Sequence, residues 1–278
     1  MPRQFKLINA KGLSWDLMDR TALLYLPNGM GFRMSSKYMK IGAAYQLIST
    51  EAEQKVISGE MVFSGYQRYR DFADFIVSTP LKLAYMPQNE WAYLDCEVSR
   101  LDKGEIDYRD LKLKCAIDFT ATSKWYIPRN AQRSGISVAN AKQYTYSYTY
   151  TYADSITGII DIINNSSEDS PAVMTILGQI TNPTWSLIVN NAIRASGSVS
   201  GTVDTGEKLV INSKDNQLEI AVYDATTNEW LRNVYQDSDF NRENFIYVPP
   251  GNSTLQVSGS VSDSIDAWAE IEEIHETI

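Results

Sequence analysis

The side chains suited to acid–base or nucleophilic chemistry are few or poorly placed in this sequence. The single histidine, His275, stands three residues from the end of the 278-residue chain. A general base needs a pocket that holds it against its substrate, which a chain end rarely supplies. The sequence also has no G-x-S-x-G nucleophile elbow, no H-E-x-x-H zinc helix and no phosphate-binding P-loop. We therefore predict a protein that is not an enzyme, with no catalytic residues, no cofactor and no metal site.

Two segments begin like ligand-binding motifs but lack residues that those motifs require. Gly29–Gly31 starts like a dinucleotide-binding loop, yet Met34 stands where the third glycine belongs. Asp237–Asn241 starts like an EF-hand calcium loop, yet Arg242 replaces its glycine and Val248 its last glutamate. We interpret the first segment as a turn and the second as a solvated acidic loop.

Residues 144–152 read YTYSYTYTY, with five tyrosines at every second position. Successive side chains of a β-strand point to opposite faces, so a strand here places all five phenol rings on one face. That face could be a platform for stacking sugars, a contact between subunits or an ordinary packed face. Because the segment should begin the second domain, we interpret it as packing in or against that domain.

Aromatic side chains and carboxylates leave two other functions open. Trp185, Trp230 and Trp268 suit either the core of a β-sandwich or the stacking of sugars. The 34 acidic residues include no pair that the sequence singles out for glycoside cleavage. Carbohydrate binding is therefore the main alternative function, and glycoside hydrolysis is the third.

The charge of the chain changes sign between its halves. Residues 1–140 carry 19 basic and 15 acidic side chains, a net charge of +4, whereas residues 141–278 carry 6 and 19, a net charge of −13. Such a break favours two domains. Neither half has the basic patch that neutralises phosphates, so we predict no sequence-specific nucleic-acid binding.

The composition, with 44% hydrophobic and 21% charged residues, is typical of a globular protein. Apolar segments are too short to cross a membrane, so we predict no membrane insertion. The first residues lack the apolar region of a signal peptide. Cys96 and Cys115 are too few for a disulfide framework, and we expect both to be reduced in a cytoplasm.

The first half should contain one helix between strands. Residues 55–63 and 81–86 have strand patterns, and apolar residues recur at helical spacing over 66–76. Ser64 and Gln67 form the S-x-x-Q pair that caps a helix start. Two alternating segments, 91–101 and 111–119, then predict a long hairpin with one wet face, in whose register Cys96 lies opposite Cys115.

Residues 127–143 lose periodicity and collect Pro, Gly, Ser and Asn, so we place the linker here and the domain boundary between residues 138 and 139. Beyond the linker every apolar pattern has strand period. Many short strands with regular turns predict a β-sandwich or jelly roll. After the tyrosine-rich segment, the predicted strands are 156–163, 172–180, 184–189, 209–212, 218–223, 230–235, 254–257 and 267–274.

Several segments together resemble the distal tail protein (Dit) family of bacteriophages with long, non-contractile tails. In the first half these are FKLINAKGLSWDLMD, VISGEMVFSGYQRYRDFADFI, LKLAYMP, YLDCEV and CAIDFTATSKWY. In the second half they are ILGQITNPTWSL, GEKLVINS and FIYVPPGNSTLQVSG. The resemblance covers essentially the whole chain, with the segments in the expected order.

The resemblance implies a mainly β protein. Residues 1–138 would form a ring-forming, β-sandwich-like tail domain with one α-helix and a long hairpin, and residues 139–278 a galectin-like or jelly-roll β-sandwich. Six N-terminal domains would close a ring around the channel through which DNA leaves. The C-terminal domains would project outward. No catalytic residues come with this family.

The implied function is that of a structural virion protein, the hexameric hub of the tail tip or baseplate. Its implied partners are other copies of the chain, the major tail tube protein, a tail-tip or tail-associated lysin protein, and receptor-binding proteins. It would be assembled in the host cytoplasm and lie at the distal end of the tail. The chain has no room for the carbohydrate-binding module that some relatives carry, which disfavours direct recognition of host sugars.

Overall fold

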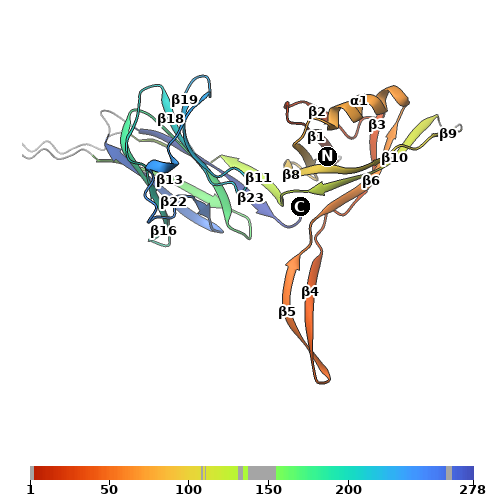
Figure 1. Cartoon of the computed structure of the whole chain (residues 1–278), viewed down its shortest axis with the longest axis horizontal. Coiled ribbons are helices and arrows are strands. Elements are labelled where there is room, and N and C mark those ends of the chain that lie inside the picture. Colours follow the sequence, from red (N-terminus) through yellow and green to blue (C-terminus); the bar gives the residue numbers. More distant parts are fainter. Residues whose placement is uncertain (1–2, 108, 110, 131–133, 137–154, 261–264) are drawn as a thin grey trace, which may run out of the picture. The chain divides into compact units, whose positions relative to one another are not determined.

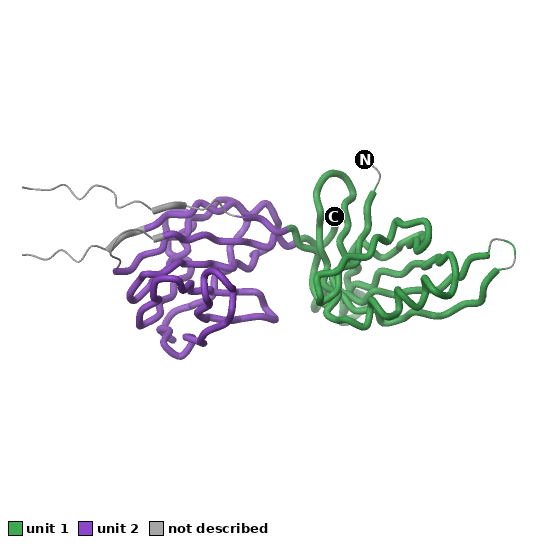
Figure 2. The backbone as a smooth tube through the Cα atoms, turned by 90° about the horizontal axis from the view of Figure 1, so that it is seen from above, with its two compact units in different colours: residues 1–127, 275–278 green, residues 128–274 purple. Residues whose placement is uncertain are grey.

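The computed structural model describes residues 3–107, 109, 111–130, 134–136, 155–260 and 265–278. The chain forms two compact units, residues 1–127 with 275–278 and residues 128–274 (Figure 2). Strands dominate both units, and α1 (Tyr66–Ile76) is the one α-helix among the described residues, which confirms the predicted mainly β class (Figure 1). The boundary between residues 138 and 139 stays a prediction, and the tyrosine-rich segment 144–152 lies outside the described residues.

The first unit is built on an antiparallel sheet with its own hydrophobic core. The predicted strands at 55–63 and 81–86 are confirmed. A short strand, β9 (Ile106–Asp107), pairs with β10 at the tip of the β8–β10 hairpin. At the opposite end of the hairpin, β11 (Trp125–Asn130) pairs with β8. In the order in which they pair, the main strands are β2 (Ser14–Asp16), β1 (Gln4–Ile8), β7 (Leu81–Met86), β8 (Ala92–Asp102), β10 (Lys112–Ala121), β6 (Val56–Phe63) and β3 (Ala22–Asn28).

Helix α1 contacts the core through one fully buried aromatic side chain. The ring of Phe72 lies 5.4 Å from that of Trp15 and 5.5 Å from that of Phe63, measured between centroids. The predicted helix is confirmed, but its predicted cap is wrong. Gly65 is the N-cap, and no side chain caps the helix. Gln67 is therefore the second residue of the helix, whereas a capping box needs the third residue to bond back to the N-cap. The Gln67 side chain donates to Asp71 instead.

The predicted long hairpin is confirmed as β8 and β10, but the predicted register is wrong. Cys96 lies opposite Ala121, and Cys115 lies opposite Met61 of β6. A bulge at Ser99 of β8 and the pairing of β9 with β10 shift the two strands past the predicted register. Alternation alone cannot detect a slip by an even number of residues, because the same side chains stay on the same face.

The second unit consists of two antiparallel sheets that share one hydrophobic core. The strands predicted from residue 156 onward are confirmed, but the strand predicted at 172–180 ends at Leu177 and the one predicted at 230–235 ends at Asn233. Short elements complete the unit: β12 (Ser134–Ile136), β17 (Thr202–Val203), η1 (Tyr235–Asp237) and β21 (Tyr247–Val248). The first sheet has the order β23 (Ile265–His275), β14 (Ser170–Leu177), β18 (Glu207–Asn212), β19 (Glu219–Asp224) and β20 (Trp230–Asn233). The second sheet has the order β13 (Ser155–Asn164), β22 (Gly251–Ser260), β15 (Ile180–Val189) and β16 (Ala192–Ser198).

Trp185 anchors this second core. Its side chain is buried, and its Nε1 donates a hydrogen bond of 3.0 Å to the backbone oxygen of Asn244. The indole lies over Gly197 of the neighbouring strand, where a Cβ would stand 2.4 Å from two ring carbons. Strand β16 therefore needs small residues beneath the indole. Small residues give a weak strand pattern in the sequence, so β16 is not among the predicted strands.

Both thiols should be inert in the folded protein. Burial raises the pKa of Cys96 to about 12 and also raises the pKa of Cys115, so little thiolate exists at neutral pH. A thiol reagent should find no reactive group in buffer and two after denaturation, because both free cysteines are buried. A disulfide in freshly purified protein would contradict both this burial and the observed register.

The contact between Trp185 and Gly197 predicts a large effect from one methyl group. Gly197→Ala should lower the free energy of unfolding by about 1–3 kcal/mol, because the added Cβ overpacks a buried site. Ser196→Ala, in the same strand, is the matched control. Urea unfolding measures both variants, and equal stability of the two would show that the indole moves aside freely.

Candidate functional site

A ribbon of two strands, here called the arm, leaves the first unit between β3 and β6. It consists of β4 (Met34–Ile41) and β5 (Ala44–Ala52), which form a separate two-stranded sheet (Figure 1). Almost all of its side chains are exposed on both faces. Its exposed large hydrophobic residues are Met34, Tyr38, Met39, Ile41, Tyr45, Leu47 and Ile48.

The register of the arm gives its two faces different chemistry. Tyr38 lies opposite Leu47, and Lys40 lies opposite Tyr45, so these four side chains share one face. We call this the aromatic face. The exposed fractions of Tyr38 and Tyr45 are 60% and 69%. Lys37 lies on the opposite face.

An isolated two-stranded hairpin is at best marginally stable in water. The arm has an open edge along each strand and buries neither face in the described part of the chain, so it lacks the packing that normally supports a sheet. Exposed strand edges with apolar side chains are a liability in a free protein. The arm therefore has the properties of a surface that another protein covers.

The sequence analysis did not single out the arm. A usable signal is Gly42, which has a φ of 63° in the two-residue turn between β4 and β5. Two-residue hairpin turns require a positive φ at their first central position, where glycine is favoured. The strands themselves alternate poorly, because neither face is buried and apolar residues occur on both.

The arm joins the sheet through two segments, here called the root: Asn28–Arg33 and Glu53–Ser58. Gly29, with a φ of 90°, lies so close to the backbone oxygen of Val56 that a Cβ would stand 2.1 Å from it. The backbone nitrogen of Glu53 donates to the backbone oxygen of Arg33 at 2.9 Å and closes the base of the arm. Position 29 therefore needs glycine both for its conformation and for the close approach.

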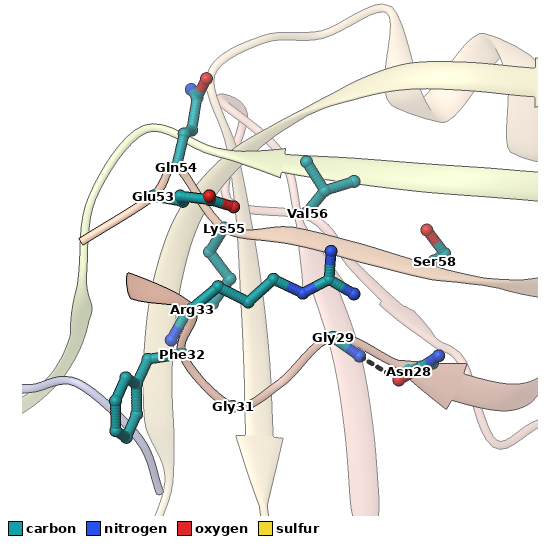
Figure 3. A pocket seen from close by; sticks show the side chains of 10 residues that line it. All are labelled: Asn28, Gly29, Gly31, Phe32, Arg33, Glu53, Gln54, Lys55, Val56 and Ser58. Carbon is teal, nitrogen blue, oxygen red and sulfur yellow. Dashed lines mark hydrogen bonds between the residues drawn. The ribbon is translucent and has the colours of Figure 1, made fainter. Parts of the chain in front are cut away.

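A hollow of about 480 Å³ lies between the root segments (Figure 3). The Arg33 guanidinium extends into it, with the Glu53 carboxylate above (Figure 3). Neither charged group has a hydrogen bond or ion pair within the described residues. The hollow is thus polar and charged, and it is accessible to a partner at the base of the arm.

Lys55 ties this root to the end of the chain. Its Nζ donates a hydrogen bond of 2.6 Å to the backbone oxygen of Glu276, and the Glu276 carboxylate lies 2.5 Å from Nζ of Lys124. Burial lowers the pKa of Lys55, while the Glu276 carboxylate acts in the opposite direction. The last four residues therefore belong structurally to the first unit.

The motif-like segments do not assemble a ligand site. Asp239 accepts hydrogen bonds from the backbone nitrogen of Asn241 and from Nε of Arg242, which lowers its pKa and occupies the carboxylate within its own turn. Gly29 serves the arm root, as described above. The described residues contain no group of three metal-ligating side chains, and none of their helices is long and apolar enough to span a bilayer.

The three tryptophans considered for sugar stacking have different environments. Trp185 is buried in the second core and Trp268 is half-buried, whereas Trp230 is 56% exposed. Trp230 is therefore the most exposed of the three rings considered for a sugar platform. Carbohydrate binding therefore stays a hypothesis.

Glu273 is the one charged side chain that is fully buried among the described residues. Its Oε1 accepts hydrogen bonds of 2.9 and 2.8 Å from the backbone and side chain of Asn165, and its Oε2 lies 2.8 Å from Nε of Arg129. Burial opposes the charged form, but these donors outweigh it and the pKa of Glu273 is lowered. The carboxylate thus links β23 to Arg129 of β11 and to Asn165, the residue after β13.

The mainly β fold and the exposed apolar arm define the class of the protein: a β protein of two units with a surface suited to contact with another protein. The comparison with family models identifies the class more closely. Residues 4–122 match the model described as the distal tail protein, N-terminal domain. These residues thus form a distal tail protein N-terminal domain, and the resemblance to the bacteriophage distal tail proteins is confirmed.

Solved structures share the fold over the whole chain. A chain from the baseplate of phage P2 in its activated conformation with calcium has 19% identity and a TM-score of 0.70, with 100% of both chains covered. The same baseplate with strontium gives 18% and 0.70, also over 100% of both chains. The Dit protein of phage SPP1 gives 9% and 0.63, covering 97% of this chain and 98% of that one. No curated protein matches the sequence.

The Glu273 cluster predicts a stability that depends on pH. Because its folded pKa lies below the ordinary value of 4.5, Glu273 stabilises the second unit above that value, and this contribution is lost as pH falls through the folded pKa. Glu273→Gln should lower the free energy of unfolding by about 1–3 kcal/mol at neutral pH. Urea unfolding at neutral and acid pH measures the difference.

The matched control is Glu270→Gln, which alters an exposed carboxylate of the same strand. This control should leave the unfolding free energy nearly unchanged at both pH values. The gap between wild type and Glu273→Gln should shrink on acidification. A gap that stays constant with pH would rule out the ionised Glu273 as its source.

Proposed function

We propose that this chain is a structural protein of a bacteriophage tail tip or baseplate. Six copies form a ring through their first units, and the ring continues the tail tube and surrounds the channel for DNA. Other copies of the chain, the major tail tube protein, a tail-tip or tail-associated lysin protein and receptor-binding proteins are its partners. The protein is assembled in the host cytoplasm and lies at the distal end of the tail.

The observation that carries this proposal is the arm. Its apolar side chains are exposed on both faces and its strands form a sheet of only two, so it needs a covering partner. It leaves the same unit that matches the distal tail family. A second copy of the chain offers such a partner wherever the ring assembles, and head-to-tail contacts close into a ring when the rotation fits.

The charge of each unit supports their different roles. The first unit carries 17 basic and 16 acidic side chains, a net charge of +1, and the second carries 8 and 18, a net charge of −10. Six nearly neutral units meet little repulsion when they crowd into a ring, whereas six strongly acidic units favour separation. A weakly charged channel also holds DNA loosely, because few counterions are released.

The second unit supports a recruiting role in this proposal. Its acidic surface suits partners of opposite charge, since complementary potentials steer association. We assign residues 139–278 to a galectin-like sandwich that faces outward and holds other tail proteins. The solved relatives whose descriptions name a baseplate and a hub adsorption apparatus are consistent with this assignment.

Replacing the aromatic face of the arm should prevent assembly without unfolding the chain. Tyr38→Ser, Tyr45→Ser and Leu47→Ser together remove three exposed side chains, so the first unit should keep its melting temperature. Each apolar side chain buried in an interface contributes about 1–3 kcal/mol, so association should weaken at least about 100-fold. Mass measurement of the full chain, alone and with co-expressed tail proteins, detects the change.

Val77→Ser is the matched control, because Val77 is 77% exposed and lies outside the arm. It should assemble like the wild type. Wild-type protein that stays monomeric and binds no tail protein would contradict the proposed function. An image of the assembled tail tip without six-fold symmetry at this layer would do the same.

A further inference from the structure

A small hollow, here called the valine hollow, is formed in the second unit by residues of β17, β19, β20, η1 and the segment before β17. Its volume is about 190 Å³. Four buried valine side chains of the second core line it: Val199, Val203, Val222 and Val234. Exposed or half-buried residues form its border: Ser200, Gly201, Thr202, Arg232 and Asp237. The hollow thus has an apolar lining and a polar border.

Of the two charged side chains at this border, only one is free. Nη1 and Nη2 of Arg232 lie 2.6 and 2.7 Å from Oε1 and Oε2 of Glu207, and Nη2 also donates to the backbone oxygen of Thr202. The bonds with Glu207 raise the pKa of Arg232, and the Asp204 carboxylate acts in the same direction. The Asp237 carboxylate has no hydrogen bond or ion pair within the described residues. Three carboxylates thus outnumber one guanidinium, and the charge around the hollow is negative.

Hydrogen bonds hold the border of the valine hollow in place. The backbone nitrogen of Ser200 donates to the backbone oxygen of Asp237 at 2.8 Å. The side-chain oxygen of Asn182 accepts a hydrogen bond of 2.9 Å from the backbone nitrogen of Gly201. A site that is ordered before binding loses less conformational entropy when a partner docks. The Asp237 carboxylate is therefore presented from a backbone that is already fixed.

The volume of the valine hollow suits a single side chain. Pockets for small-molecule ligands usually measure about 300–1,000 Å³, and this hollow is smaller. A lysine side chain matches an apolar lining with a carboxylate at its border, because lysine buries its aliphatic stem and keeps its ammonium group in water. Arginine matches less well, because its planar guanidinium is best held by two parallel bonds to one carboxylate.

Every basic side chain among the described residues of the second unit is already bonded. Lys208 donates to Asn228, and the other five form ion pairs. These pairs are Arg129–Glu273, Arg194–Asp169, Lys214–Glu272, Arg232–Glu207 and Arg242–Asp239. Because the unit has a net charge of −10, the free carboxylate of Asp237 is complementary to a cation that a partner supplies.

We propose that the valine hollow receives a lysine side chain of another tail protein, whose aliphatic stem packs on the valines and whose ammonium group binds Asp237. This inference rests on the proposed function, in which the second unit holds other tail proteins. It adds the place of the contact and the side chain that makes it. The second unit of another copy is a poor source of this lysine, because two units of net charge −10 repel each other.

A carbodiimide tests this contact directly, because it joins a carboxylate to an amine that lies against it. Tails assembled in cells that produce all the tail proteins are treated with the reagent, and linked peptides are identified by mass spectrometry. The peptide that contains Asp237 should be joined, through Asp237, to a lysine of another tail protein. Tails that carry Asp237→Asn should lack this product.

Two results of the cross-linking would overturn the inference. A link from Asp237 to a lysine of this same chain would show a different occupant. Absence of any link from Asp237, in tails that contain all their proteins, would exclude a lysine from the hollow. Both results leave the proposed function standing, because the chain is part of the tail in each case. Absence of the chain from the assembled tails would instead contradict the proposed function.

Charge reversal at the hollow gives a second test. Asp237→Lys should weaken the binding of the cross-linked protein to the purified full-length chain about tenfold, because it sets two ammonium groups against each other. Asp237 is exposed, so the melting temperature of the chain should stay unchanged. Unchanged binding by Asp237→Lys would overturn the inference.

The matched control for charge reversal is Glu270→Lys. It makes the same change of charge at an exposed carboxylate of β23, which three strands separate from β20 in the sheet order. This variant should bind the partner like the wild type. Equal losses for Asp237→Lys and Glu270→Lys would show a general effect of net charge and would also overturn the inference.

Discussion

Every β-strand needs a neighbouring strand, and this requirement determines how the elements of this molecule are arranged. Backbone N–H and C=O groups must be paired, and a sheet must bury one face, before strands are stable in water. In both units, antiparallel ladders and a closed core meet these conditions. The arm does not meet them within the chain, because β4 and β5 have only each other. The arm is therefore the feature on which the proposed assembly of several copies rests.

The two units can tolerate such an arm because each has an independent hydrophobic core. Phe72 and the strands around it form the first core, and Trp185 organises the second. The polar clusters reinforce this arrangement: Glu273 is fully bonded by Asn165 and Arg129, and Lys55 is bonded by Glu276. None of the apolar area of the arm is needed for these cores, which leaves it free for a partner.

The carboxylates that form clusters within the second unit are held by their own neighbours. Glu273 is bonded by Asn165 and Arg129, and Asp239 is occupied within its own turn. A hollow of about 480 Å³ lies at the base of the arm, where charged and apolar side chains are exposed together. These are the properties of a docking surface.

The sequence by itself determined the class of the fold. Alternating apolar residues identified β6, β7, the β8–β10 hairpin and most strands of the second unit, and helical spacing identified α1. The family resemblance, carried by several short segments, was also available from the sequence. These features are local, since side-chain period depends only on the backbone conformation of a few neighbouring residues.

Only the tertiary structure decided the register and the contact surfaces. Whether Cys96 faces Cys115 depends on a bulge and on the length of a hairpin tip, which an alternating pattern does not encode. The N-cap of α1 is Gly65 and not the predicted Ser64, because the backbone conformation of a single residue decides where the helix begins. The arm escaped detection because periodicity reports burial within one chain. The side chains of the arm are exposed in the single chain, so the sequence of the arm lacks the regular alternation of apolar and polar residues that predicts a strand.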